Sequence, residues 1–283
     1  MSPVKCILNF RMSRVGGAVR SSPEFIPVGD SSCSEADLSV AKDIAFLIHG
    51  FNVNRDEGMV SLSRLVDGLA ASGRDAVVGV LWPGDSYFGP LGYSFEGVDA
   101  DDTASSFTTY IKETWRRPSK PILSFAAHSK GCRVALETVK GLPRAFDGSI
   151  DQICLMAGAV DDTCLSDPAV YRQAAAKAKR VTVMSSVNDR VLRFAYPAGD
   201  LLQAFIYADD IAGSALGYKG YRDGNFKSPD KKPLKIPIPD SRKQGHGDYL
   251  PPSDSSSTSP NQNQNLTLEE MQRTLRVNTQ PTT

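Results

Sequence analysis

The sequence lacks the features of a membrane-spanning or a nucleic-acid-binding protein. No apolar run approaches the roughly 20 residues that a transmembrane helix requires. The apolar stretch within residues 1–12 is too short for a signal peptide, and no small-residue cleavage site accompanies it. Neither sign of charge is in excess, because 32 lysines and arginines balance 32 aspartates and glutamates. We therefore expect a cytoplasmic protein with no nucleic-acid partner, with export by another kind of signal left open.

The sequence is also poor in cysteine. The five cysteines are Cys6, Cys33, Cys132, Cys154 and Cys164, an odd number with wide spacing and no CxxC pair. That spacing argues against a zinc site. Three of the five sit in apolar runs, where cysteine behaves as a small core residue in a reducing compartment.

What the sequence does contain is a regular alternation of two patterns. Continuous apolar runs of strand length are followed by segments with apolar residues at helical spacing, which is typical of a parallel sheet covered by helices. The five strongest runs are residues 43–50, 76–82, 121–127, 150–160 and 180–187. Residues 4–12 and 24–28 are expected to be edge strands. The fold class predicted is α/β, with a doubly wound, mostly parallel sheet and helices on both faces.

A change of composition divides the chain near its end. Residues 1–250 are expected to form one α/β domain, in which residues 227–240, with four prolines, are an irregular excursion. Residues 251–283 begin with Ser, Pro, Asn and Gln and have little to bury, so we expect a disordered tail. One short helix is predicted within it, where Thr267 and Glu270 have the spacing of a capping box.

The segment ILSFAAHSKGCRVALETV gives the strongest indication of a catalytic residue. A buried strand runs into Ser129, and a helix begins at once after Gly131. A serine on such a sharp strand-to-helix turn, a nucleophile elbow, projects its hydroxyl above the sheet at a helix N-terminus, which favours developing negative charge. Ala127 replaces the first glycine of the usual G-x-S-x-G pattern, a change of one methyl group. The alternative is a serine that only caps a helix.

A second motif lies upstream, in IAFLIHGFN. A buried strand ends in His49 and Gly50, the position at which hydrolases with an elbow build half of their oxyanion hole. The backbone N–H of Phe51 and that of Lys130, the residue after the serine, are the predicted donors. An ordinary glycine at a strand end is the alternative.

Elimination among three histidines indicates a base. A serine hydroxyl needs a neutral imidazole within hydrogen-bond reach to take its proton. His128 stands beside the serine on the elbow and is expected to point the other way, whereas His49 is expected to brace its own turn. His246, between two glycines on a late loop, remains as the predicted base, the alternative being a solvated loop histidine.

The predicted acid is Asp189, which follows the strand 180–187 at the carboxyl edge of the sheet. Asp161 and Asp162 follow the preceding strand and are the rivals, although we prefer to interpret them as helix caps. A surface salt bridge from Asp189 to Arg190 or Arg193 is the other alternative.

These motifs together carry a resemblance. The strings IHGFN, VLWPGDS, AAHSKGCRVAL and SSVNDRVL, followed by a late histidine, resemble an uncharacterised bacterial, esterase- and lipase-like branch of the α/β-hydrolase superfamily over about residues 40–250. The resemblance implies the fold, the oxyanion donors and a catalytic triad in the chain order Ser129, Asp189, His246. It implies no substrate, because the superfamily hosts many chemistries.

The function predicted is that of a serine hydrolase, which cleaves a carboxylic ester or related acyl bond through an acyl-enzyme. No metal or organic cofactor is required, and the expected partner is a small or lipid-like acyl substrate. Trp82, Tyr87, Phe88 and Tyr93 are candidate walls of an acyl pocket, or else members of a packed surface loop.

Two classes of alternative stay open. A thioesterase, lipase or amidase would use the same site. A hydrolase-fold module without catalysis would bind a partner through a groove or through the tail. Deletion of residues 251–283 is expected to abolish binding by such a module and to leave an enzyme active.

Overall fold

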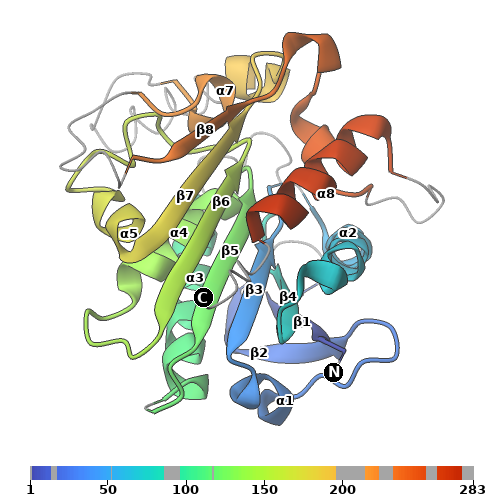
Figure 1. The fold of residues 1–283 in the computed structure, drawn as a ribbon, viewed down its shortest axis with the longest axis vertical. Helices are drawn as coiled ribbons and strands as arrows, with labels where there is room; N and C mark the ends of the chain where they lie inside the picture. Colours follow the sequence, from blue (N-terminus) through green and yellow to red (C-terminus); the bar gives the residue numbers. More distant parts are fainter. Residues whose placement is uncertain are drawn as a thin grey trace, which may run out of the picture.

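The computed structural model of the protein describes residues 2–13, 18–51, 53–85, 96–116, 118–195, 214–222, 232–252 and 260–275. Its centre is one eight-stranded sheet in the order β2-β1-β4-β3-β5-β6-β7-β8 (Figure 1). The strands are β1 (Val4–Arg11), β2 (Val19–Pro27), β3 (Asp43–Ile48), β4 (Ala76–Leu81), β5 (Ile122–His128), β6 (Ser149–Met156), β7 (Ala178–Ser185) and β8 (Leu234–Pro237). Only β2 runs antiparallel to its neighbour, so the predicted fold class is confirmed.

The five strongest apolar runs became β3 to β7, but the predicted edges were partly wrong. Strand β1 pairs on both sides, with β2 and with β4, so that β2 alone forms this edge. At the other edge, residues 234–237 within the predicted irregular excursion pair with β7 as strand β8. Its prolines concealed this strand in the sequence, although proline is tolerated on an edge strand, where one side of the backbone has no partner.

Helices cover both faces of the sheet. Figure 1 shows α2 (Arg55–Leu69) and α8 (Gln262–Leu275) on one face, and α3 (Glu96–Thr114) and α4 (Gly131–Gly141) behind it on the other. The described residues also form three shorter helices: α1 (Glu35–Val40), α5 (Arg172–Lys177) and α7 (Leu216–Lys219).

The sheet divides the hydrophobic core into two clusters. Successive residues of a strand point to opposite faces, so Phe46 of β3 packs with α3, where the Phe107 ring lies 5.0 Å away. Its neighbour Leu47 packs in the second cluster, with Leu65 of α2 and Met271 of α8. The same alternation continues through β4 to β7, so these strands are packed on both faces of the sheet. The candidate site lies at the carboxyl ends of β3 to β7.

Residues 260–275 do not form part of a disordered tail. They form helix α8, whose buried residues Thr267, Met271, Thr274 and Leu275 lie at helical spacing on one face. The helix begins at Gln262 rather than at Thr267, because Asn261 and Gln264 form a reciprocal cap ahead of it. The sequence predicts a short helix in this segment, but the polar composition conceals its first residues. Packing against the sheet stabilises its sparse apolar stripe.

Two of the five cysteines form a disulfide, a pairing that the expected reducing compartment does not predict. Cys6 of β1 and Cys33, just before α1, are joined in a disulfide with a Cα–Cα distance of 5.4 Å. Cys132, Cys154 and Cys164 are free and buried. The two cysteines are separated by 27 residues, and no spacing pattern in the sequence predicts their contact. They meet because the chain turns from β2 towards α1.

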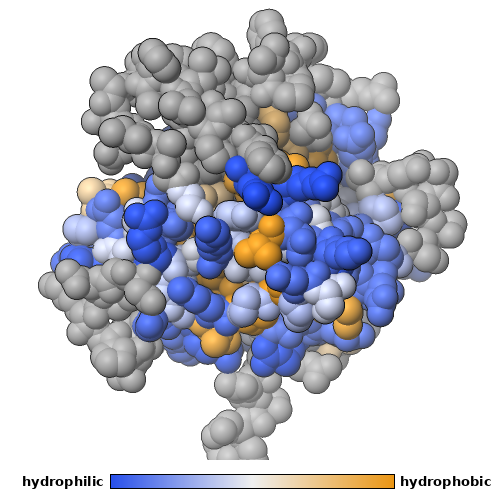
Figure 2. Space-filling view, turned by 90° about the horizontal axis from the view of Figure 1, so that it is seen from above, coloured by the Kyte–Doolittle hydropathy of each residue, from blue (hydrophilic) through white to orange (hydrophobic). Residues whose placement is uncertain are grey.

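The described residues on one face of the molecule are mainly hydrophilic (Figure 2). In the view from above in Figure 2, hydrophilic residues predominate and hydrophobic residues form small separate patches. Within the described ranges, no helix combines the length and the apolar character needed to cross a membrane.

Candidate active site

Ser129 stands on the turn between β5 and α4. Its backbone has a φ of 53°, in the left-handed region that residues with a side chain seldom adopt. The turn is held by its neighbours: Ser129 N donates to Met156 O at 3.0 Å, and Ser129 O accepts from Cys132 N at 3.1 Å and from Ala159 N at 3.2 Å. Strand β6 and helix α4 therefore over-determine the strained conformation, as expected of a nucleophile elbow.

Two glycines allow the end of β3 to touch this turn. A Cβ atom on Gly131 would lie 2.3 Å from the carbonyl oxygen of His49, and one on Gly50 would lie 2.9 Å from the Cβ of Ser129. Both approaches are closer than real Cβ contacts allow. The contact brings the backbone of Phe51 to the elbow, where the Lys130 ammonium lies over the Phe51 ring at 5.3 Å from its centroid. The segments that carry both predicted oxyanion donors therefore meet at the elbow, and the role of their N–H groups stays a prediction.

The structure brings the three predicted triad residues together. His246 Nε2 is 2.8 Å from Ser129 Oγ, and His246 Nδ1 is 2.7 Å from Asp189 Oδ2. Asp189 is fully buried, whereas 17% of the His246 side chain is exposed, so the imidazole faces both the interior and the solvent. These contacts join side chains that are separated by 117 and 57 residues in the chain.

The rival acids lie elsewhere. Asp161 Oδ1 accepts hydrogen bonds from the backbone and the hydroxyl of Thr163, at 2.7 and 2.6 Å, within a turn. No helix begins at these described residues, so the interpretation of Asp161 and Asp162 as helix caps was wrong. Asp162 pairs with Arg222. In Asp189, Oδ1 accepts from the backbone N–H of Leu192 at 3.0 Å, which leaves Oδ2 directed at His246.

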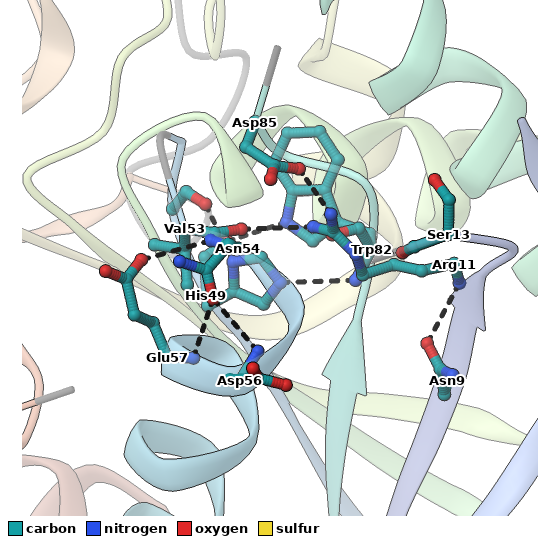
Figure 3. Close-up of polar contacts among 11 residues, drawn as sticks. Asn9, Arg11, Ser13, His49, Val53, Asn54, Asp56, Glu57, Trp82 and Asp85 are labelled. Carbon is teal, nitrogen blue, oxygen red and sulfur yellow. Dashed lines mark hydrogen bonds and ion pairs between the residues drawn. The ribbon is translucent and has the colours of Figure 1, made fainter. Parts of the chain in front are cut away.

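His49 braces its own turn, as its position in the sequence indicates. Its Nε2 accepts from the backbone N–H of Trp82 at 3.2 Å, so the proton is on Nδ1, 2.7 Å from Gly50 O. The Trp82 indole returns a bond to His49 O at 2.9 Å. Burial lowers the pKa of His49 to about 4, which keeps the imidazole neutral. Figure 3 shows the bonds between His49 and Trp82.

Arg11, at the end of β1, is a residue that sequence reasoning missed. Its buried guanidinium donates to Val53 O at 3.0 Å and to Trp82 O at 3.1 Å, and it pairs with Asp85 (Figure 3). This one guanidinium thus links β1 to the loop after β3 through a hydrogen bond, and to the loop after β4 through a hydrogen bond and an ion pair. The only signal in the sequence is an arginine that ends an otherwise apolar run.

His128 was predicted to point away from the site, and that prediction was wrong. Its ring lies 4.9 Å from the His246 ring, and its Nε2 donates to the carbonyl oxygen of His246 at 2.9 Å. Burial and the neighbouring His246 hold the pKa of His128 well below its usual value, so a neutral ring makes this bond. His128 therefore supports the backbone that carries the candidate base.

The model of a family described as “Alpha/beta hydrolase of unknown function (DUF900)” matches residues 34–199, more than half of the chain. The chain belongs to this family. The match includes Ser129 and Asp189 but ends before His246 and α8. No functionally curated protein matches the sequence.

Solved structures similar to this α/β hydrolase have low identity to it. A putative cell surface hydrolase from Lactobacillus plantarum is 12% identical, covers 83% of this chain and 91% of its own, and has a TM-score of 0.44. A Listeria innocua gene product is also 12% identical, with 83% and 94% covered and a TM-score of 0.40. The NocB thioesterase domain of a nocardicin cluster is 14% identical, with 82% and 93% covered and a TM-score of 0.36.

The predicted acyl pocket of this hydrolase is described only in part. Tyr87, Phe88 and Tyr93 lie outside the described residues. Trp82 is fully buried and stacks on His49, with ring centroids 5.7 Å apart. Its described contacts support the end of β3, and a role in binding acyl groups stays a prediction. Among the residues that the structure describes, no three His, Cys, Asp or Glu side chains gather to hold a metal ion.

Proposed function

We propose that this α/β hydrolase is a serine hydrolase that cleaves a carboxylic ester or a related acyl bond. The observation that carries the proposal is the continuous hydrogen-bonded chain from Ser129 Oγ through the His246 imidazole to the buried Asp189 carboxylate. A serine hydroxyl becomes a nucleophile when a neutral imidazole accepts its proton, and the carboxylate holds the required tautomer and stabilises the imidazolium.

In the proposed reaction, His246 acts in turn as base and as acid. His246 Nε2 takes the proton of Ser129 as Oγ attacks the acyl carbon, and the backbone N–H groups of Phe51 and Lys130 stabilise the oxyanion. The imidazolium then gives its proton to the departing alkoxide, which leaves an acyl-enzyme. Water then gives a proton to His246 as its oxygen attacks the acyl carbon, and the imidazolium returns that proton to Ser129 Oγ as the ester bond breaks. The acid product and free Ser129 result.

Two features support the oxyanion donors in this scheme. Lys130 immediately precedes α4, so its N–H belongs to the positive end of the helix dipole. The loop that carries Phe51 is held against the elbow by the close contact at Gly50 and by the bonds of His49 and Arg11. Donors that are fixed before the reaction need no reorganisation when charge develops, which is the main source of their effect.

The test is labelling with a fluorophosphonate probe, mapped by mass spectrometry, on wild-type protein and on Ser129→Ala and His246→Ala. We expect wild type to label at Ser129, Ser129→Ala not to label, and His246→Ala to label at least ~10²-fold more slowly. Circular dichroism serves to show that the variants are folded. Folded wild-type protein that takes up no probe would contradict the proposal and favour a binding module. A panel of esters, thioesters, lipids and amides then separates the alternative substrates.

A further inference from the structure

The segment that carries His246 has little structure of its own. Residues 244–249, called the histidine loop below, contain one short 3-10 turn, His246–Tyr249. Its internal support is a bond from Gly245 N to Asp248 Oδ2 at 2.8 Å and one from Asp248 N to Gly245 O at 3.2 Å. A turn of this size does not hold an imidazole to the tolerance that proton transfer needs, so other elements must hold it.

Helix α8 contacts the histidine loop with its first turn. Asn261 uses Oδ1 to cap the helix at Gln264 N, at 2.9 Å, and Nδ2 to donate to Asp248 Oδ1, also at 2.9 Å. Gln264 completes the cap, accepting from Asn261 N at 2.8 Å, and its amide nitrogen lies 3.5 Å from Gly247 O. The groups that begin the helix are thus the groups that hold the loop.

A second contact is buried beneath the loop. The side chain of Gln244 is fully buried and donates to Thr267 Oγ1 of α8 at 3.1 Å. The carbonyl oxygen of Gln244 accepts from Ser186 Oγ at 2.8 Å, and Ser186 O accepts from Asp189 N at 3.2 Å. One chain of hydrogen bonds therefore runs from α8 through the loop to the turn that carries Asp189.

Helix α8 is itself firmly attached to the domain. Met271 and Leu275 are fully buried in the cluster beneath α2. Gln272 Nε2 donates to Gly68 O of α2 at 2.8 Å, and the buried Arg74 guanidinium donates to Leu275 O at the end of the helix. The helix is therefore a fixed support against which the loop can be held.

We propose that α8 is a positioning element of the active site, which holds the histidine loop so that His246 stays in reach of both Ser129 and Asp189. Asn261 and Thr267 are the positioning residues. The inference rests on the proposed function and extends it to a segment beyond the family match. It follows that removal of α8 costs activity, contrary to the expectation from sequence that the tail is dispensable to an enzyme.

The test uses the full chain and two variants that disturb the loop by different routes. Asn261→Asp keeps an oxygen to cap α8 but removes the donor to Asp248, at an exposed position where folding is not at risk. Thr267→Val keeps the volume and removes the hydroxyl that accepts from Gln244. Gln272→Ala is the control, because it removes a bond between α8 and α2 and none to the loop.

The readout is the rate of fluorophosphonate labelling at Ser129, resolved into the maximal rate kinact and the half-saturating concentration KI. We expect Asn261→Asp and Thr267→Val to lower kinact by ~10-fold or more with little change in KI, since a small misplacement of a proton acceptor is costly. Thr267→Ser, which restores the hydroxyl, should recover most of the rate. Gln272→Ala should label like wild type although it lowers the melting temperature.

The outcomes separate the two proposals. If wild-type protein labels but both loop variants label as fast as wild type, the inference about α8 is wrong and the serine hydrolase stands. If Gln272→Ala loses as much kinact as the loop variants do, the effect is one of general stability and the positioning role is wrong. If folded wild-type protein does not label at Ser129, the proposed function and this inference fall together.

Discussion

At the scale of single residues, the elbow requires glycine at positions where a Cβ atom would clash with a neighbouring segment. Ser129 keeps a strained backbone because β3, β6 and α4 meet around it. Strain of this kind persists only where the surroundings over-determine it. Gly50 is the residue on the β3 side of that contact, and its missing side chain is a condition for the site.

Gly50→Ala is expected to impair the site. The new Cβ would lie 2.8 Å from His128 Nδ1 and 2.9 Å from Ser129 Cβ, so the loop or the elbow must shift. We expect labelling at Ser129 to slow by ~10²-fold, and the free energy of unfolding in urea to fall by about 1–3 kcal/mol. The control is Gly158→Ala, where a Cβ would meet its nearest neighbour at an ordinary 3.4 Å. Equal labelling rates for the two variants would contradict the prediction.

At the scale of elements, β1 reaches the site through the guanidinium of Arg11. This strand lies outside the residues that the family model matches, yet its last residue bonds the loops that follow β3 and β4. The end of β1 is therefore a support of the oxyanion loop as well as a member of the sheet.

Arg11→Met is expected to lower both stability and labelling. It leaves the Asp85 carboxylate buried without its ion pair, which typically costs about 3–5 kcal/mol. The double variant Arg11→Met/Asp85→Leu removes that buried charge, and urea unfolding should show that much of the stability returns. The bonds to Val53 O and Trp82 O stay lost, so labelling should stay slow. A double variant that labels like wild type would show that Arg11 matters only for stability.

Helix α8 is the other element whose contribution can be measured alone. Met271 is fully buried between α8 and the sheet. Met271→Ala removes apolar area and leaves a cavity, for which losses of about 2–5 kcal/mol are typical. Urea denaturation measures the loss, with Glu269→Ala on the exposed side as the control. A loss below ~0.5 kcal/mol would mean that α8 is not docked in solution.

At the scale of the whole molecule, stability should depend on pH through two neutral histidines. Burial lowers the pKa of His49 to about 4, and it lowers that of His128 well below its usual value. The unfolded chain takes up protons below about pH 6.5, whereas the folded protein does not, so acidification favours unfolding. From pH 7.5 to pH 5.5 we expect the free energy of unfolding to fall by roughly 1–2 kcal/mol for each histidine.

Urea unfolding at a series of pH values measures this slope. Asp43, Asp99 and Asp162 have a raised pKa through burial and act with the opposite sign at lower pH, which sets pH 5.5 as the limit of the series. His49→Asn should lower stability at pH 7.5 and flatten the slope, because one of the two groups no longer titrates. A slope that is unchanged in the variant would mean that His49 is not held neutral in the folded protein.

The sequence by itself determined the layers of this fold and the chemistry available to it. Apolar runs and helical spacing are local patterns, so β3 to β7 and helices α2 to α4 could be predicted from them. Ser129 was found because its strand and helix are adjacent in the chain, and His246 because only three histidines were available to choose from. Asp189 followed from its place after a strand at the carboxyl edge.

Tertiary structure alone decided which groups support those residues. His128 contacts the carbonyl of a residue 118 positions away, and Arg11 contacts one 42 positions away and another 71 away. Helix α8 and β8 are stabilised by the surfaces that other elements offer them. The weak local pattern of α8 therefore indicated only part of the helix, and that of β8 concealed the strand. A periodic pattern in the sequence indicates which face of a helix or strand is buried. Which residues that face contacts depends on how the elements pack, and the tertiary structure alone shows it.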